Sequence, residues 1–326
     1  DIYKESVNYL TGYKYLCNEQ LASKLIGLLA YQQYMQSKGE KVKVDKAIRP
    51  IIHRLTNHQN KHQLWSWWGN SENTSFWMSA HILRALKMAQ DAGYPVELNL
   101  NGLKVEYAHT RPYRGMKLED IEILHALHEW KVEADYSSAI RLLEPFVRQL
   151  EQKEDSLANR NKYYRPLSYL KEKLLLWEIK QQVDSVNVGD SVRPYLKKDM
   201  LEGVYCDDGR RTYYWEGNHM INTLIAYRII KNDPSLCKLK ENMQLYILRT
   251  KERGWNTYQA SSAVATVLTD LLAGSGGMSG TSVSVSGKDH QRIMEFPYHA
   301  RLTAGDSLLI SKTGKEPLLY SVYSMK

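Results

Sequence analysis

Apolar residues recur three and four positions apart along most of the chain, up to about residue 273. Leu21, Leu25 and Leu28 share one face of the segment Glu19–Gln36, and Gly39 follows as a helix stop. This spacing places the apolar side chains on one stripe of an α-helix. The same pattern predicts further helices at residues 46–58, 73–93, 117–130, 136–153, 166–183, 212–231, 236–250 and 257–273. The sequence therefore predicts a mostly α-helical body.

Several of these helices share an aromatic-rich entry, which is a weak internal repeat. The entries are Trp67-Trp68-Gly69, Tyr214-Trp215-Glu216 and Gly254-Trp255. Repeated helix pairs stack on one another or close into a ring. We therefore expect an α/α toroid of about six helical hairpins.

The pattern changes at Gly274-Ser275-Gly276-Gly277, where small residues interrupt the helical spacing. Beyond this stretch the apolar residues alternate, which predicts strands at 281–285, 307–311 and 318–323. So few strands do not make an independent sandwich. We predict a helical domain over residues 1–274, and over residues 275–326 a C-terminal β segment that belongs to an adjoining β-sandwich domain.

The composition is that of an ordinary globular protein, with one bias: 23 Tyr and 8 Trp stand against 3 Phe. Such residues suit grooves and sugar platforms as well as cores. The net charge is +8, but acids and bases are interleaved, as in residues 38–46. Without a basic run or a nucleic-acid motif, we expect no nucleic-acid partner. The chain opens on Asp1 without a signal peptide, which we interpret as a fragment of a longer protein.

The three cysteines are Cys17, Cys206 and Cys237, an odd number without metal-type spacing. Cys206 and Cys237 could pair in an oxidising compartment, which would leave Cys17 as the unpaired cysteine. Alternatively, both could be buried reduced thiols.

Two histidine pairs have the spacing of a chelating helix face, but neither has a third ligand at a recognisable distance. His58 and His62 lie four residues apart and are expected to be solvated or to cap a helix. His125 and His128 are expected to line the interior of the toroid. We therefore predict no metal site.

The most specific local signal is Tyr13-Lys14-Tyr15-Leu16-Cys17-Asn18-Glu19-Gln20. A Cys three residues before a Gln, at the start of a helix, can reach the side-chain carbonyl through one tight turn. The sulfur then displaces ammonia and forms an internal thioester, which acylates amines and hydroxyls because thiolate leaves readily. We predict that Cys17 and Gln20 form this bond, that Tyr13 and Tyr15 shield it, and that the helix N-terminus stabilises the released thiolate.

These residues resemble the thioester motif of the alpha-2-macroglobulin and complement family, usually Gly-Cys-x-Glu-Gln. Bacterial members often show Tyr-Pro-Tyr-Gly-Cys-x-Glu-Gln. Tyr13, Tyr15, Cys17, Glu19 and Gln20 fall on matching positions. The resemblance implies that Glu19, like the tyrosines, helps to position the bond.

Two positions depart from the family pattern: Lys14 replaces the usual Pro and Leu16 the usual Gly. Both changes alter the turn that positions the sulfur. Residues 74–96 and 255–260 resemble later parts of the family's thioester domain. Residues 310–322 resemble strands that follow this domain in bacterial members.

In this family, such a domain belongs to a large protein that changes shape when a protease cuts it. The resemblance therefore implies a covalent trap and protease inhibitor that acts once, rather than an enzyme. Its partners would be proteases or surface nucleophiles, and other domains of a larger parent chain. The thioester forms by itself, so no cofactor is expected. Some members use a histidine to receive the acyl group, and His109 is a candidate for that role. Bacterial members imply a location in the periplasm or cell envelope.

Two alternatives are open. An α/α-barrel carbohydrate-active enzyme would use tryptophans as sugar platforms and two facing carboxylates as acid and base. Its candidate residues are Trp65, Trp67, Trp68, Glu72, Asp207, Asp208 and Glu216. A thioester-free descendant would use the helical domain only as a binding surface, which the departures at Lys14 and Leu16 would explain.

Overall fold

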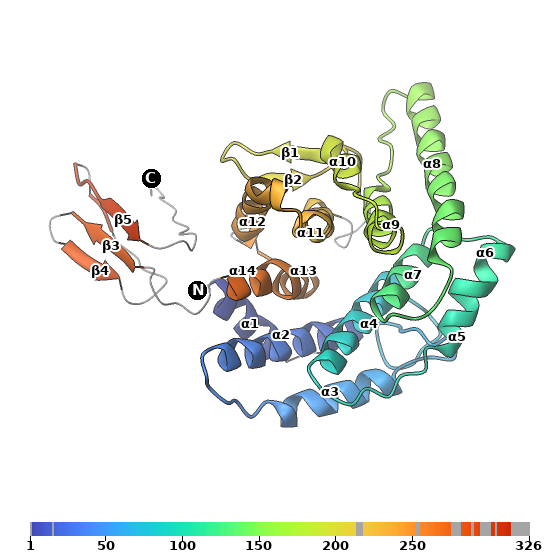
Figure 1. Cartoon of the computed structure of the whole chain (residues 1–326), viewed down its shortest axis with the longest axis horizontal. Coiled ribbons are helices and arrows are strands. Elements are labelled where there is room, and N and C mark those ends of the chain that lie inside the picture. The colour runs from blue at the N-terminus through green and yellow to red at the C-terminus, as the bar shows by residue number, and fades with distance from the viewer. Residues whose placement is uncertain are drawn as a thin grey trace.

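The computed structural model describes residues 2–14, 16–212, 218–251, 254–274, 282–287, 290–293, 301–303 and 305–313. Helices dominate this part of the chain (Figure 1). They are α1 (Ile2–Gly12), α2 (Asn18–Ser37), α3 (Asp45–Asn57), α4 (Phe76–Asp91), α5 (Asn101–Leu103), α6 (Arg111–Arg114), α7 (Asp120–Glu129), α8 (Tyr136–Arg160), α9 (Leu170–Val183), α10 (Gly189–Val192), α11 (His219–Ile230), α12 (Cys237–Thr250), α13 (Thr257–Ala263) and α14 (Thr269–Gly274). The π-helical segments η1 (Lys104–Thr110) and η5 (Val264–Leu268) join α5 to α6 and α13 to α14, and short 3-10 turns are η2 (Arg193–Tyr195) and η3 (Pro234–Leu236).

The strands form a hairpin and a separate sheet. The hairpin pairs β1 (Leu196–Lys198) with β2 (Val204–Cys206). In the sheet, β3 (Ser282–Ser286) lies between β4 (His290–Ile293) and β5 (Leu309–Thr313), and both neighbours are antiparallel to it. Figure 1 shows this sheet apart from the helices.

Each helix predicted from the apolar spacing is present, although four begin later than expected. The helices predicted from residues 73, 117, 166 and 212 begin at Phe76, Asp120, Leu170 and His219. The predicted strand at 281–285 is confirmed, the one at 307–311 is shifted by two residues, and 318–323 lies outside the described residues. The sequence did not predict α1, the helical stretch from 101 to 114, the β1–β2 hairpin or β4. The strands β1, β2 and β4 have three or four residues each, too few to show a period. The helix α1 is longer, with 11 residues, and was missed although Tyr3, Val7 and Leu10 lie at helical spacing.

The long helices fall into two kinds by burial. Some helices, such as α11, are buried on all sides. In α11 nearly every residue from Met220 to Ile230 is buried from solvent. Helices such as α3 bury one stripe, with Ile48 and Ile52 inside and charged residues outside. A helix that is apolar all round requires neighbours on all sides, whereas an amphipathic helix covers others.

Helix contacts follow a closed cycle. The helices α2, α4, α7, α9, α11 and α13 contact one another in that order, and α13 also contacts α2. Of the remaining helices, α1 and α3 pack on α2, α8 on α9 and α12 on α11. No helix in the described part of the chain has the length and apolar character needed to cross a membrane.

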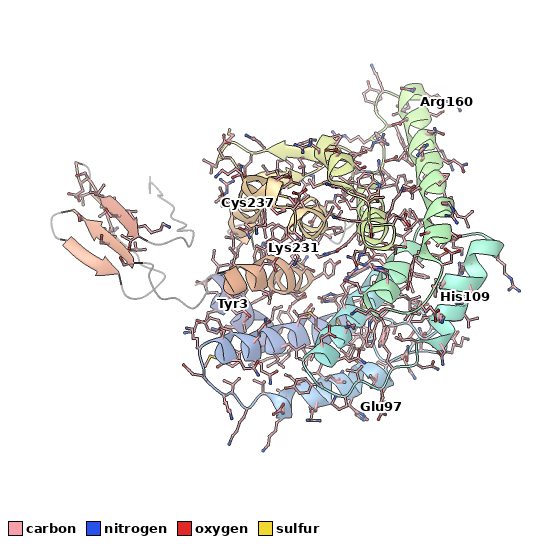
Figure 2. The ribbon with its side chains drawn as sticks, in the orientation of Figure 1. Tyr3, Glu97, His109, Arg160, Lys231 and Cys237 are labelled. Carbon is pink, nitrogen blue, oxygen red and sulfur yellow. The ribbon has the colours of Figure 1, made fainter. Side chains whose placement is uncertain are left out.

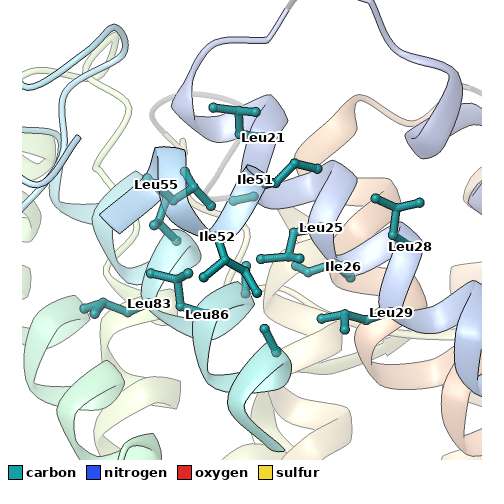
Figure 3. Close-up of a cluster of buried hydrophobic side chains, with 14 of the residues drawn as sticks. Leu21, Leu25, Ile26, Leu28, Leu29, Ile51, Ile52, Leu55, Leu83 and Leu86 are labelled. Atoms are coloured by element: carbon teal, nitrogen blue, oxygen red, sulfur yellow. The ribbon is translucent and has the colours of Figure 1, made fainter. Parts of the chain in front are cut away.

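The core around α2 combines neighbouring segments of the chain with distant ones, such as Ala260 and Val264. Leucine and isoleucine side chains of α2, α3 and α4 interlock in a single cluster (Figure 3). Gly27 allows α1 to pack closely on α2, because a Cβ at this position would lie 2.8 Å from Leu10 Cβ. This packing brings the end of α1 against the middle of α2.

Candidate functional site

The predicted thioester residues form the first turn of α2. Cys17 is the N-cap, with extended backbone angles (φ −70°, ψ 173°). Its backbone N–H donates to Gln20 Oε1 at 3.1 Å, and its Sγ accepts a hydrogen bond from the Gln20 N–H. This is a capping box with a thiol in place of the usual hydroxyl. The local geometry of a helix start therefore brings the two side chains together.

The start of α13 has the same arrangement without sulfur. Asn256 N–H donates to Gln259 Oε1 at 3.1 Å, and Gln259 N–H donates to Asn256 Oδ1 at 2.8 Å. The comparison indicates that Cys17 occupies the place of an ordinary capping residue. The cysteine is therefore compatible with the helix start before any covalent bond forms.

The Cys17 side chain is buried, with 4% of its surface exposed. Burial raises the pKa of its thiol, and the nearby Gln20 N–H offsets only part of this effect. An apolar environment disfavours the thiolate relative to uncharged forms. A sulfur at this position is therefore more stable as a thiol or a thioester than as a free anion.

A turn at residues 66–69 lies directly against the start of α2. Asn18 N–H donates to the Trp67 carbonyl at 3.0 Å, and Asn18 Nδ2 donates to the carbonyls of Ser66 (2.8 Å) and Gly69 (2.9 Å). Because these contacts fix the orientation of the Asn18 amide, its Oδ1 accepts from His58 Nδ1 at 2.6 Å. Apart from the aromatic run itself, no sequence pattern indicated this arrangement.

An aromatic row continues from this turn into the molecule. Trp67 meets Trp77 edge to face at 5.8 Å between ring centroids, and Trp77 meets Tyr258 at 5.0 Å. Of the predicted shielding tyrosines, Tyr13 is half-buried and meets Tyr9 edge to face at 5.9 Å. Tyr15 lies outside the described residues. Trp67 is therefore a further residue that adjoins the motif.

Glu19 lies at the centre of a buried polar network. Its two carboxylate oxygens accept from Ser23 Oγ at 2.7 Å and from Thr257 Oγ1 at 2.8 Å. Ser23 Oγ also lies 3.0 Å from both His81 Nε2 and Ser261 Oγ. Burial raises the pKa of Glu19 and lowers the pKa of His81 to about 3, so His81 is neutral at pH 7. The network joins the motif to α4 and α13.

A second buried network consists of ion pairs. Arg84 donates to Glu129 at 2.8 Å, while Glu178 accepts from His125 at 2.8 Å and from two nitrogens of Arg228, both at 2.7 Å. Burial by itself would lower the pKa of His125, but Glu129 and Glu178 reverse this and raise it. The network links α4, α7, α9 and α11, four helices of the closed cycle.

A cavity of about 300 Å³ lies between the two networks. Its lining includes His81, Arg84, Lys171, Arg228 and Tyr258. Lys171 is itself paired with Glu122. The cations Arg84, Lys171 and Arg228 in this lining are thus each paired with a carboxylate.

The aromatic residues of the carbohydrate interpretation are divided by burial. Trp65 is fully buried, and its Nε1 donates to the Leu55 carbonyl at 2.7 Å. Its interpretation as a sugar platform is therefore wrong. Trp67 and Trp68 are 41% and 65% exposed.

The carboxylates of the same interpretation have local partners. Glu72 pairs with Lys61, Asp207 with Lys197 at 2.7 Å, and Asp208 accepts from Ser168 Oγ at 2.8 Å. Glu216 lies outside the described residues. The described carboxylates thus serve in separate local contacts.

The predicted acyl acceptor His109 lies on the exposed side of η1, at the edge of the helical body (Figure 2). η1 contacts α5, α6 and α7. No hydrogen bond or ring contact among the described residues joins His109 to Cys17 or Gln20. Its role stays a prediction.

The remaining histidines and cysteines are also placed. His125 is buried in the ion-pair network, whereas His128 is half-buried and packs edge to face on Tyr136. Across the described ranges, no group of three or more His, Cys, Asp or Glu side chains is arranged to hold a metal ion. Cys206 is buried in β2 and Cys237 is exposed at the start of α12. Both are free thiols, so the disulfide between them is not formed, and the expectation that both are buried is wrong for Cys237.

Comparison with solved structures supplies the context of this site. Native alpha-2-macroglobulin from Escherichia coli, spanning domain MG7 to the C-terminus, matches 95% of this chain with a TM-score of 0.59 and 14% identity. The chain has the fold of a segment within this part of bacterial alpha-2-macroglobulins. The native E. coli protein seen by cryo-EM matches 95% of the chain with a TM-score of 0.57 and 15% identity. Salmonella alpha-2-macroglobulin reacted with methylamine matches 95% with a TM-score of 0.52 and 15% identity.

This likeness confirms the predicted resemblance at the level of the fold. The chain spans 46% of the first of these structures and 18% and 19% of the other two. No protein-family profile matches the sequence, and no curated protein matches it either. The likeness to bacterial alpha-2-macroglobulins thus rests on three-dimensional structure.

Proposed function

We propose that this chain is the thioester domain of an alpha-2-macroglobulin-like protein that traps proteases. The observation that carries the proposal is the paired geometry of Cys17 and Gln20 in the first turn of α2. It is supported by the fold, which resembles E. coli alpha-2-macroglobulins described as activated by trypsin and by elastase. In this proposal the closed helix cycle is an α/α toroid, and the β3–β5 sheet belongs to an adjoining β domain.

The chemistry begins with Cys17 Sγ attacking the side-chain carbonyl carbon of Gln20. The carbon–nitrogen bond breaks, ammonia leaves with the thiol proton, and the thioester closes across the turn. An attacking amine later forms an amide with the same carbon and releases the Cys17 thiol. The event happens once per molecule, so the domain acts as a trap rather than as a catalyst.

Shielding preserves the bond until an acceptor arrives. Trp67 adjoins the motif through the backbone contact with Asn18, and Tyr13 lies on the preceding segment. We propose that these aromatic residues exclude water from the bond. Glu19 holds the first turn in place from the buried side through Ser23 and Thr257. The parent protein would act in the periplasm or cell envelope.

Intact-mass measurement of freshly prepared native protein tests the proposal. The wild type should be lighter than its sequence by one ammonia, with Cys17 blocked to thiol reagents. Methylamine should add its own mass and release one thiol. Cys17→Ala and Gln20→Ala should lose the deficit, whereas the matched control Cys237→Ser should keep it. A full sequence mass with a freely titrating Cys17 in fresh wild-type protein would overturn the proposal and favour a thioester-free binding domain.

A further inference from the structure

The surface around the start of α2 carries positive charges without matching carboxylates. The helix α3 returns alongside α2 (Figure 1), and Arg54 near its end donates through Nη2 to the Leu16 carbonyl at 3.4 Å. Lys24 Nζ donates to the backbone carbonyl of residue 13 at 3.3 Å. Lys14 is exposed, three residues before the motif cysteine. None of these three cations forms an ion pair with a described residue.

The carboxylates of residues 2–14 and 16–80 do not balance this charge. Glu5 and Glu72 are each paired with a lysine, and Glu19 is buried in the polar network. Glu40 and Asp45 follow the opposite end of α2, a helix of 20 residues. That end lies about 30 Å away, beyond the reach of screened charges in salt solution. Among residues 2–14 and 16–80, the unpaired charges nearest to Cys17 and Gln20 are therefore positive.

Charged residues around the thioester can discriminate between acceptors that present the same nucleophile, a lysine amine, in different surroundings. A positive rim repels a lysine that lies among other cations and attracts one that lies among carboxylates. It also favours the neutral form of an arriving amine over its ammonium form, and only the neutral amine attacks. Exposed Trp67 and Trp68 beside the motif suit a protein partner, since tryptophan is enriched where proteins bind one another.

We propose that this site selects its target by charge, and that the preferred acceptor is a lysine amine on an acidic protein surface. The inference rests on the proposed thioester. In the transfer, the neutral lysine nitrogen attacks the Gln20 acyl carbon and forms an amide. The carbon–sulfur bond breaks, and the proton lost by the nitrogen ends on the Cys17 sulfur.

Three acetylated pentapeptides with one central lysine test the selection on the full chain. The lysine is flanked by two glutamates, two glycines or two arginines, and the rate of peptide attachment is measured by intact mass. Each rate is divided by the rate at which the same peptide reacts with a simple alkyl thioester. Differences in lysine basicity between the peptides then cancel. At low ionic strength the acidic peptide should react about fivefold faster than the neutral one, and the basic peptide correspondingly slower. In about 1 M salt, where the screening length is about 3 Å, the three rates should converge.

Variants assign the effect to these residues. Lys14→Ala combined with Arg54→Ala should bring the three peptides to nearly equal rates, while methylamine still releases Cys17. The matched control, Lys41→Ala with Lys43→Ala, removes two exposed cations near the far end of α2 and should leave the preference intact. Equal rates for the three peptides on wild-type protein that has the ammonia deficit would overturn the charge selection and leave the thioester standing. Absence of the deficit would instead refute the proposed function itself. Faster attachment of an acidic polysaccharide hydroxyl than of any peptide amine would overturn the choice of a protein target.

Discussion

Replacing Glu178 by Gln should destabilise the helical body strongly. Glu178 accepts three hydrogen bonds from charged or chargeable donors: one from His125 and two from Arg228, at 2.7 to 2.8 Å. Its side chain is 10% exposed, so water does not replace these contacts. Removing the negative charge leaves the Arg228 cation, whose side chain is 22% exposed, without its carboxylate.

The magnitude follows from the cost of an unpaired buried charge. Breaking one partner of a buried pair costs about 3–5 kcal/mol. Glu129 also attracts Arg228, so we place the loss at the lower end, about 3 kcal/mol. For a helical body of this size, that loss should lower Tm by about 6 °C.

The matched control is Glu144→Gln on α8, which is the same chemical change. Glu144 pairs with Lys180, which lies on α9 like Glu178. That pair is more open, with side-chain exposures of 33% and 27% and a distance of 2.9 Å. Its loss should cost less than about 1 kcal/mol. Both variants are compared with wild type by calorimetry and by urea unfolding. Equal shifts in the two variants would refute the reasoning that burial sets the strength of the Glu178 contacts.

Further predictions concern pH, packing and shielding. Because Glu129 and Glu178 outweigh burial and raise the pKa of His125, its protonation stabilises the fold fully below about pH 6.5, and this contribution is lost as pH rises through the raised folded-state pKa. His125→Gln should therefore flatten the fall of Tm with pH above 6.5; an unchanged slope would contradict this. Gly27→Ala should lower stability by about 1 kcal/mol in urea unfolding, since contact with Leu10 costs more than the gain in helix propensity of about 1 kcal/mol. A variant more stable than wild type would show that α1 shifts to accommodate the added methyl group at little cost. If the thioester forms, Trp67→Ala should speed its spontaneous hydrolysis severalfold, measured by thiol release over time, and an unchanged rate would exclude Trp67 as a shield.

Much of the helical framework was predictable because the apolar residues repeat at the helical period over many turns. The segment Glu19–Gln36 was placed to within one residue at either end of α2. The β1–β2 hairpin, with three residues in each strand, was too short to be predicted. Burial of single aromatic residues was not predictable either: Trp65 is fully buried, while Trp68, three positions later, is 65% exposed. Burial depends on what other segments cover, and the local spacing does not contain that information.

The sequence by itself determined that Cys17 and Gln20 face each other, since three residues at a helix start span one turn whatever surrounds it. Only the tertiary structure decided what encloses that turn. Thr257 reaches Glu19 from 238 positions along the chain, and Asn18 binds the turn at 66–69. The closed helix cycle and the buried ion pairs are likewise contacts between distant segments. Such contacts depend on how whole helices pack, because each polar group must find its partner once water is excluded.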